Sequence, residues 1–322
     1  MLEKKVLNLG TRSSPLAMAQ ANLAKAAIKN QFPELEINIC PVHTSGDKDR
    51  VRSLVQFGGT GVFVKELEEE LLEGNIDFAV HSLKDVPEAT DSRLELVGFL
   101  PRATPFDVLV AGNKTFESLP KGAKVGTGSP RRVLQLRAKR PDLCCLDLRG
   151  NLESRIAKVK NGELDAILLG AAGLERLGLS QEISEIFSPE VLTPAVGQGI
   201  VAFQCCKDNS FVRNVLEKAS NPEAALAAKL ERSWMNSLGG GCRVPMAAFA
   251  NVLETQVEFF AYLANPNSSE FIREKICWNR DSNLQENLKE FLTYFIAECN
   301  QRNIPLPRDV HEHALLHFWG KL

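Results

Sequence analysis

The chain has 322 residues, of which 44% are hydrophobic and 24% are charged, and its net charge is −2. This length allows two or three domains with cores of their own, and the composition is that of a globular protein. The charge gives no reason to expect nucleic-acid binding, and no stretch is long and apolar enough to span a membrane. The first residues lack a signal-peptide core, so we expect a cytoplasmic protein whose eight cysteines are thiols.

Strands and helices alternate along the first part of the chain. Ser14 is the expected N-cap of a helix whose first position is Pro15. Alternation of this kind is typical of an α/β domain with a largely parallel sheet. The predicted strands cover 4–10, 35–45 and 76–82, and the predicted helices cover 15–30 and 61–74.

The same order of elements returns later in the chain. "GTRSSP" is matched by "GTGSP", and "EGNIDFAV" is matched by "NGELDAIL". The segments 97–110 and 188–203 then read as two crossovers between the repeated units. Two similar α/β lobes of the periplasmic-binding-protein type are therefore expected around a cleft, where ligands commonly bind.

The last third of the chain has a different character. A helix is predicted over 222–238, a hairpin over 252–279 and an amphipathic helix over 284–301. We expect a small α+β domain here. The predicted division is domain 1 at 1–99 with a return segment at 198–218, domain 2 at 100–197, and domain 3 at 219–322.

Arginine and hydroxyl side chains crowd two predicted helix starts. A helix N-terminus offers free N–H groups and a partial positive charge, and guanidinium groups bind carboxylates in pairs of hydrogen bonds. Plain capping beside solvated arginines is the alternative. Because the two lobes have similar starts, we favour a ligand with several carboxylates or phosphates. The residues concerned are Arg12, Ser14, Thr127, Ser129, Arg131 and Arg132, with Arg149, Arg155 and Arg176 further on.

Two further motifs carry reactive groups. Lys84 and Asp85 follow a strand end, where an aspartate can act as an acid or base, although a surface ion pair would look the same. Cys242 follows three glycines in "SLGGGCRVP", which suggests an exposed thiol that serves as an attachment point rather than a buried cysteine. His311, His313 and His317 favour a solvated terminus over a metal site.

Eight segments, in this order, closely resemble the porphobilinogen deaminase (hydroxymethylbilane synthase) family. They span about residues 6 to 250. They are "RSSPLAMAQ", "FVKELEEELL", "VHSLKDVP", "GTGSPRR", "LRGNLESR", "LDAILLGAAGLERLG", "PAVGQG" and "LGGGCRVP".

The resemblance implies a specific transferase. Members of the family join porphobilinogen molecules head to tail, release ammonia and give a linear hydroxymethylbilane for tetrapyrrole (haem) biosynthesis. A dipyrromethane cofactor stays attached by a thioether to the cysteine that matches Cys242. Each pyrrole carries an acetate and a propionate, so cationic partners are needed to bury the growing chain. The glycines beside the cysteine would let the tethered chain swing.

Residue roles follow from the resemblance position by position. Asp85 matches the catalytic aspartate, which stabilises charge on the substrate and moves protons. Beside Cys242, the implied cofactor-binding residues are Lys84, Ser129, Arg131, Arg132 and Arg155. The implied substrate-binding residues are Arg12, Ser14, Gln20, Thr127, Arg149, Asn151, Arg176 and Gln198. No metal is implied. The expected partners are porphobilinogen and its chain intermediates, and we expect a monomer.

The chain departs from the family pattern at a few positions. Thr60 stands where the family commonly has lysine, and Gln204 and Cys206 replace a glutamate and an arginine. We expect the second difference to alter an ion pair between domains. Two lobes around a cleft also describe a solute-binding protein, but such a protein would need a secretory signal and no cysteine tether. The departures at Thr60 and Gln204 leave a second alternative, a family member that binds a tetrapyrrole without making one.

Overall fold

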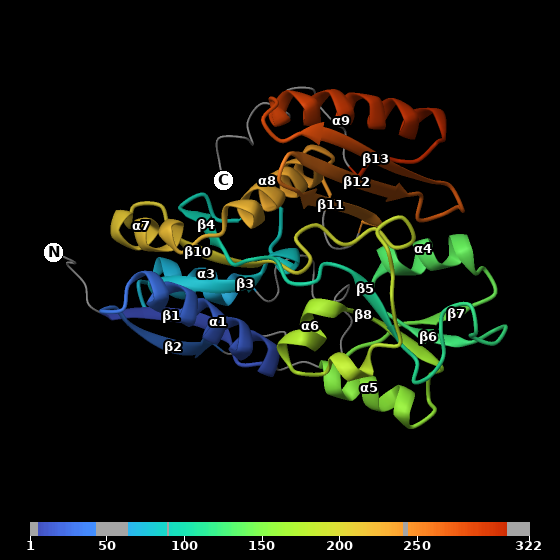
Figure 1. Ribbon diagram of the computed structural model, residues 1–322, viewed down its shortest axis with the longest axis horizontal. Helices are drawn as coiled ribbons and strands as arrows, with labels where there is room; N and C mark the ends of the chain where they lie inside the picture. The colour runs from blue at the N-terminus through green and yellow to red at the C-terminus, as the bar shows by residue number, and fades with distance from the viewer. Residues whose placement is uncertain (1–5, 43–63, 89, 241–243, 308–322) are drawn as a thin grey trace.

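Three β-sheets organise the chain in the computed structural model, which describes residues 6–42, 64–88, 90–240 and 244–307. Figure 1 shows the first sheet on the left, the second at lower right and the third across the top. The mixed α/β architecture matches the class predicted from the alternation of strands and helices. No described helix has the length and apolar character needed to cross a membrane.

The first sheet has the strand order β2-β1-β3-β10-β4. Its apolar strands are covered on one face by α1 and α7 and on the other by α3, which gives two separate clusters of buried side chains. The strands are β1 (Val6–Arg12), β2 (Glu36–Val42), β3 (Phe78–Ser82), β4 (Leu94–Phe99) and β10 (Val201–Cys206). The helices are α1 (Pro15–Gln31), α3 (Lys65–Leu72) and α7 (Ser210–Lys218).

The second sheet repeats this plan with the order β7-β6-β8-β5-β9. Its strands are β5 (Asp107–Val110), β6 (Lys124–Gly126), β7 (Cys144–Leu146), β8 (Ala166–Gly170) and β9 (Glu185–Ile186). The helices are α4 (Pro130–Lys139), α5 (Leu152–Lys160) and α6 (Ala171–Arg176), and a short 3₁₀ turn, η2 (Ser180–Glu182), follows them.

Both sheets are largely parallel, and each contains one described strand that runs in the opposite direction. β1 runs parallel to β2 and β3, and β6 runs parallel to β7 and β8. β10 is antiparallel to β3 and β4, and β5 is antiparallel to β8 and β9. The expectation of largely parallel sheets is confirmed for the described strands, because only β10 in the first sheet and β5 in the second run against the other four. These two strands each enter their sheet from a crossover and not from a strand–helix–strand unit of that sheet. β10 thereby pairs with strands more than a hundred residues earlier.

The two crossovers lie against each other between the sheets. Ala103 donates its N–H to the carbonyl of Gly199 at 3.2 Å, and Arg102 donates Nε to the carbonyl of Gln198 at 2.9 Å. Gly199 has a φ of +88°, and a Cβ there would lie 2.5 Å from the carbonyl oxygen of Ala103. Only glycine fits this contact without strain. The domain boundaries at residues 99, 197 and 218 stay a prediction.

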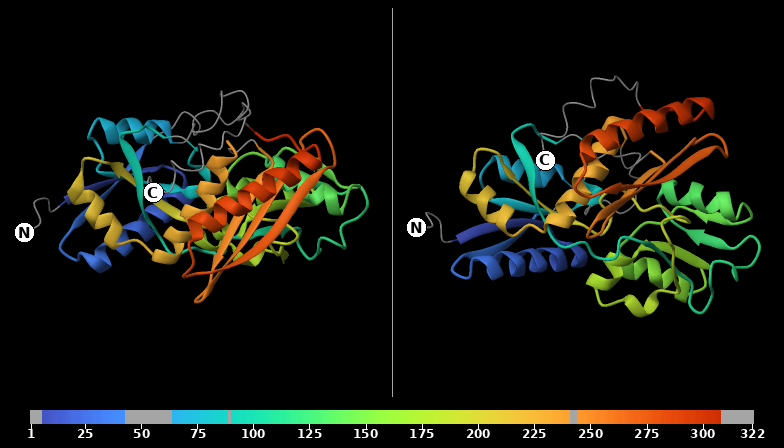
Figure 2. Two further views of the ribbon diagram at one scale, coloured as in Figure 1. Left: turned by 90° about the horizontal axis from the view of Figure 1, so that it is seen from above. Right: turned by 45° about the horizontal axis from the view of Figure 1, so that its top comes forward.

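The third sheet is an antiparallel meander covered by two helices. β11 (Met246–Val252), β12 (Gln256–Ala264) and β13 (Phe271–Asn279) pair in order. α8 (Pro222–Ser237) and α9 (Leu284–Gln301) pack against it, and the views in Figure 2 show α9 along its outer side. The predicted hairpin and final helix are confirmed. β11 was missed because its alanine-rich sequence lacks a clear alternation of apolar and polar residues.

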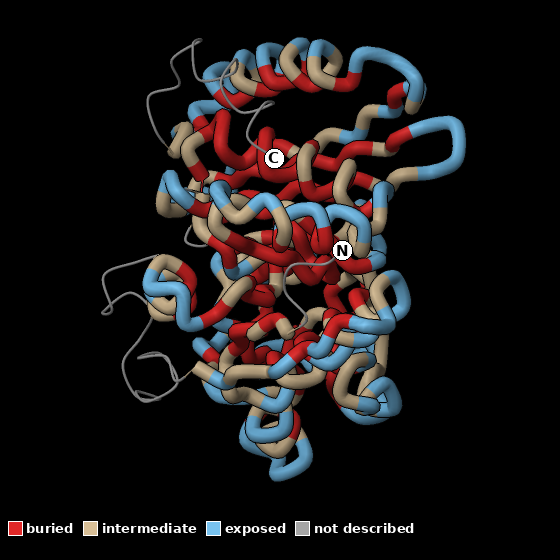
Figure 3. The backbone as a smooth tube through the Cα atoms, turned by 90° about the vertical axis from the view of Figure 1, so that its left-hand side faces the viewer, coloured by how far each residue is buried: buried red, intermediate tan, exposed pale blue. Residues whose placement is uncertain are grey.

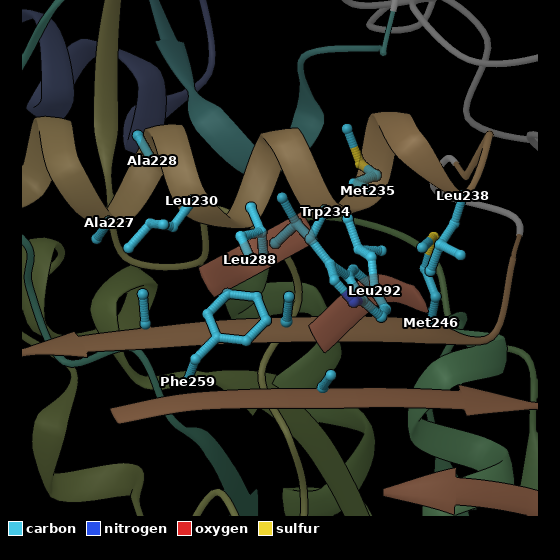
Figure 4. Packing of buried hydrophobic residues seen from close by; sticks show 14 of the residues in the cluster. Ala227, Ala228, Leu230, Trp234, Met235, Leu238, Met246, Phe259, Leu288 and Leu292 are labelled. Carbon is cyan, nitrogen blue, oxygen red and sulfur yellow. The ribbon is translucent and has the colours of Figure 1, made fainter. Parts of the chain in front are cut away.

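One large core joins the third sheet to the first. Trp234 of α8 lies at its centre, edge-on to Phe259 and Phe295, as the close-up in Figure 4 illustrates for the α8 side. The same cluster contains Leu83 and Val86, which flank Lys84 and Asp85. Figure 3 shows the buried stretches running through the interior of all three units. The turn that carries Lys84 and Asp85 is therefore anchored in the largest core of the molecule.

Candidate functional site

The turn after β3 presents Lys84 and Asp85. It is a single 3₁₀ turn, η1 (Leu83–Asp85), and Leu83 fixes it by burying its side chain and donating its N–H to the carbonyl of Ile200 at 3.0 Å. Gln20 of α1 supports the preceding residue by donating Nε2 to Oγ of Ser82 at 2.8 Å. Lys84 is half-buried, whereas Asp85 is exposed. The turn thus directs an amine inward and leaves a carboxylate accessible.

Lys84 reaches toward the second sheet. Its Nζ donates to Oε1 of Gln198 at 3.5 Å, and a Cβ at Gly170, the last residue of β8, would lie 3.6 Å from Nζ. Burial lowers the pKa of Lys84, and the nearby charges of Asp85 and Arg132 act on it in opposite directions. Lys84, which follows a strand of the first lobe, therefore interacts with charged groups of the second lobe.

Asp107 is the centre of a buried charge cluster. Arg131 donates Nη1 to Oδ2 at 2.6 Å and Nη2 to Oδ1 at 3.2 Å, and Arg132 donates Nε and Nη2 to Oδ1 at 2.9 and 2.7 Å. Gln198 adds a donation from Nε2 at 3.0 Å. Burial alone would raise the pKa of Asp107, but the two guanidinium groups hold that pKa well below its usual range. The carboxylate stays ionised and orients both arginines.

Arg155 extends the positive charge to the start of α5. Its Nε donates to the carbonyl of Gly150 at 2.7 Å. Burial lowers its pKa, as do the charges of Arg132 and Arg149, while Asp85 raises it. Arg149 itself pairs with Asp147 at 3.3 Å. The Arg155 guanidinium therefore interacts electrostatically with Arg132 of the buried cluster and with Asp85 of the first lobe.

The structure thus brings together a subset of the sequence-predicted site. Four cations and two carboxylates interact, which leaves two positive charges in excess. They are Lys84, Arg131, Arg132 and Arg155 with Asp85 and Asp107, and Gln198 bonds to two of them. A surplus of buried positive charge is the electrostatic signature expected of a site for a polyanion.

The two helix starts differ in how they are capped. Oγ of Ser14 accepts the N–H of Ala17 at 3.3 Å, so this hydroxyl caps α1 as predicted. Ser129 occupies the cap position of α4 but its hydroxyl makes no capping hydrogen bond, and its N–H donates to Oγ1 of Thr127 at 3.4 Å. Asn151 caps α5, because its Oδ1 accepts the N–H of Ser154 at 2.9 Å. Of the two helix starts that have serine at the cap position, the start of α4 is therefore the better placed to bind an anion.

The remaining predicted residues lie near the crossovers or outside the described residues. Arg12 is half-buried at the end of β1, beside the start of α1. Arg176 of α6 donates Nη2 to the carbonyl of Gly199 at 2.6 Å, which ties the second lobe to a crossover. Cys242 lies outside the described residues, as do Thr60 and the histidines of the tail. The roles of all these residues stay predictions.

A buried carboxylate that the sequence analysis missed joins the crossovers to the third unit. Glu231 of α8 is fully buried and accepts Nη1 of Arg102 at 2.5 Å. It also accepts the N–H of Gly197 at 2.6 Å and that of Ala250 at 2.8 Å. The i, i+3 and i+4 spacing of apolar residues around Glu231 makes it a charge on a buried helix face. That is the signal which could have identified it.

The end of α8 leads toward the predicted tether. Arg232 donates Nη1 to the carbonyl of Val86 at 3.2 Å and Nη2 to that of Pro87 at 2.9 Å, so α8 holds the chain just after Asp85. The side-chain polar atoms of Ser233 and Asn236 are buried and have no hydrogen-bond partner among the described residues. Unpartnered buried polar atoms of this kind fit a polar group bound beside this end of α8.

The substitution at Gln204 lies inside the first lobe. Nε2 of His81 lies 2.9 Å from Oε1 of Gln204, whose Nε2 donates to Oε1 of Glu68 at 2.7 Å. Both partners belong to β3 and α3 of the same lobe. The expected effect on an ion pair between domains is therefore wrong for this position. The burial of His81 lowers its pKa to about 4.

Comparisons with known proteins agree on one family. "Porphobilinogen deaminase, dipyromethane cofactor binding domain" matches residues 7–214, and "Porphobilinogen deaminase, C-terminal domain" matches residues 225–288. The porphobilinogen deaminase of Geotalea uraniireducens is 37% identical over 95% of this chain and 98% of its own length. That of Geobacter sulfurreducens is 40% identical over 84% of this chain and 85% of its own. That of Limosilactobacillus reuteri is 41% identical over 83% and 88%.

Proposed function

Because this chain belongs to the porphobilinogen deaminase family, we propose that it joins four porphobilinogen molecules head to tail on a covalently held dipyrromethane and releases hydroxymethylbilane. In each addition a carbon–nitrogen bond breaks and ammonia leaves. One carbon–carbon bond forms, and a pyrrole carbon gives up its proton. Hydrolysis of the finished chain returns the primer.

The observation that carries this proposal is the cationic cluster beside an accessible carboxylate. Each added pyrrole brings two carboxylates, and the four cations of the cluster, Lys84, Arg131, Arg132 and Arg155, exceed the carboxylates of Asp85 and Asp107 by two. Guanidinium groups whose geometry a buried carboxylate already fixes lose little entropy when they bind an anion. The cluster therefore fits a ligand whose charge grows during the reaction.

The residues present also fit the dipyrromethane. Lys84, Ser129, Arg131, Arg132 and Arg155 would hold its carboxylates, and the thiol of Cys242 would form the thioether. The Ser129 hydroxyl, which makes no capping hydrogen bond at the start of α4, supports a bound anion there. The unpartnered polar atoms of Ser233 and Asn236 support a polar group beside the end of α8. When bound, the dipyrromethane supplies the electron-rich pyrrole carbon at which the chain is extended.

Asp85 acts on the incoming substrate. We assign its exposed carboxylate to the pyrrole N–H groups of porphobilinogen, where it stabilises the positive charge that develops as ammonia leaves. The same carboxylate can accept the proton released when the new bond forms. Lys84, one residue earlier, orients a substrate carboxylate and keeps it away from Asp85.

The remaining matched residues bind substrate carboxylates in this proposal. Asn151 and Gln20 support this role by fixing the helix start and the strand end beside the cluster. The full set is Arg12, Ser14, Gln20, Thr127, Arg149, Asn151, Arg176 and Gln198.

The test is incubation of the purified protein with porphobilinogen alone. We expect ammonia release and a product that absorbs as a porphyrin after oxidation. Ammonia should form in a four-to-one ratio to product. Tight binding of porphobilinogen with neither ammonia nor oxidisable product would favour the alternative of a binding protein that makes no tetrapyrrole.

A further inference from the structure

An arginine on the third sheet reaches into the second lobe beside the cationic cluster. Arg273 of β13 donates Nη2 to Oε1 of Gln135 at 2.8 Å and to the carbonyl of Val191 at 3.0 Å. Its guanidinium lies 5.3 Å from the ring centroid of Tyr262 and 5.7 Å from that of Phe271. Both acceptors belong to the second lobe, and both rings belong to the third sheet. Figures 1 and 2 show α4 at the end of the third sheet where this contact forms.

Gln135 forms hydrogen bonds both to Arg273 and to the backbone of Thr193. Gln135 is buried on α4, where its Oε1 accepts the N–H of Thr193 at 2.8 Å and its Nε2 donates to the carbonyl of Thr193 at 3.1 Å. The same carbonyl accepts Nη1 of Arg131 at 2.7 Å. Arg131 and Gln135 are four residues apart and so lie on one face of α4. Four hydrogen bonds therefore connect Arg273 to Arg131 through the carboxamide of Gln135 and the backbone N–H and carbonyl of Thr193.

The tether and the carboxylate-binding arginines are otherwise on different units. Cys242 precedes β11 by four residues, and β11, β12 and β13 form one sheet. Arg131 and Arg132 begin α4 on the second lobe. A primer that is attached to Cys242 and bound by Arg131 and Arg132 requires a fixed distance between the cysteine and the two arginines. Arg273 links the sheet that carries the tether to the helix that carries the arginines.

We propose that Arg273 is a positioning residue that, through Gln135 and Thr193, holds Arg131 in register with the sheet that carries the primer. This inference rests on the proposed function. Arg273 touches neither primer nor substrate in this account and acts through Arg131 alone. Two neutral acceptors and two aromatic rings hold it, so a lysine, which has a shorter reach and no planar guanidinium to lie against the rings, would keep only part of this contact.

The experiment compares full-length Arg273→Met with Gln135→Met, the double variant and a control. Arg280→Met is the control because Arg280 also donates to a backbone carbonyl, at Leu253, and pairs with Glu223. It follows β13, about 20 Å along the strand from Arg273. Hydrogen exchange over residues 187–196 reports the Thr193 amide, and steady-state kinetics with porphobilinogen report the positioning.

In Arg273→Met we expect faster exchange of the Thr193 amide. The KM for porphobilinogen should rise about tenfold and kcat should stay within about twofold, because the free energy of one to two hydrogen bonds corresponds to about a tenfold change in binding. Gln135→Met should give the same result, and the double variant should be no worse than either. Arg273→Lys should recover part of the KM. Arg280→Met should match the wild type.

Two outcomes would overturn the inference. Faster exchange with unchanged KM would mean that the connection exists and positions nothing, and a raised KM with unchanged exchange would mean that Arg273 acts by another route. A wild-type protein that neither carries primer nor consumes porphobilinogen would instead overturn the proposed function. The exchange data would then still decide whether Arg273 holds the Thr193 segment.

Discussion

The Nη1 atom of Arg131 donates a hydrogen bond of 2.6 Å to Oδ2 of Asp107, and Asp107 is completely buried. This ion pair explains how two adjacent arginines can be buried side by side before any ligand binds. Because Arg132 shares the same carboxylate, one acid orients two cations and leaves their combined charge positive. The site is therefore preorganised for anions at the cost of a single internal counter-ion.

Removal of that counter-ion should destabilise the protein. In Asp107→Asn two buried guanidinium groups lose their charge partner, and we expect the free energy of unfolding to fall by about 3–5 kcal/mol. Urea denaturation at neutral pH measures this change. Asp91→Asn is the control, since the ion pair of Asp91 is with exposed Arg93 rather than with a buried cation. Equal midpoints for wild type and Asp107→Asn would show that the cluster contributes nothing to stability.

Asp85→Ala should separate catalysis from folding. The side chain is exposed, so unfolding should change by no more than about 0.5 kcal/mol, whereas product formation should fall by about 10²- to 10⁴-fold. Denaturation curves test the expected stability, and the rate of product formation tests the expected loss of catalysis. Asp281→Ala, which removes another exposed aspartate, should affect neither. Full turnover by Asp85→Ala would remove Asp85 from the mechanism.

Arg155→Gln should act on substrate affinity. The variant keeps a donor for the carbonyl of Gly150 but loses the charge that faces Asp85 and Arg132. A lost charge-assisted hydrogen bond to a carboxylate should raise the KM for porphobilinogen about tenfold or more. Lys158→Gln on the same helix removes a partly exposed cation that pairs with Glu163, and is the matched control. Identical KM values for Arg155→Gln and wild type would indicate that Arg155 is only a solvated charge.

His81 should make the protein sensitive to acid. Its pKa is about 4 when folded, against an unfolded value near 6.5, so the unfolded chain binds the proton more tightly. The stability that this difference contributes is complete above pH 6.5 and is lost as the pH falls toward 4. By pH 5 the loss is about 2 kcal/mol.

The His81 prediction is tested by comparison with His81→Gln. Denaturation midpoints for both proteins between pH 7.5 and pH 5 should diverge as the pH falls, with the wild type losing more stability. Comparison of the two removes the contribution of Glu68, whose pKa is raised by burial in both. Parallel curves would contradict the assignment of a buried neutral histidine.

Several elements could be predicted from the sequence because their signals are local. Ser14 and Pro15 mark the start of α1, and the apolar face from Leu284 to Phe295 marks α9. The opposite direction of β10 could not be predicted in this way. It follows from a crossover that returns the chain to strands more than a hundred residues earlier, and no local pattern encodes that pairing.

The candidate site divides in the same way. The resemblance and the helix starts identified Arg131 and Arg132, but not Asp107, because one aspartate ahead of an apolar strand looks like a strand end. Arg273 had no signal at all, since its partners are Gln135 and Val191 from a distant part of the chain. Side chains that act across domain contacts are visible only once the chain is folded.

The mass of the intact, denatured protein is the most direct test of a primer held by sulfur. We expect the purified protein to exceed its polypeptide mass by two porphobilinogen-derived rings, and Cys242→Ser to show the bare polypeptide mass and no turnover. A catalytically active protein with the mass of the polypeptide alone would contradict the account, because the cationic cluster would then have no tethered chain to hold.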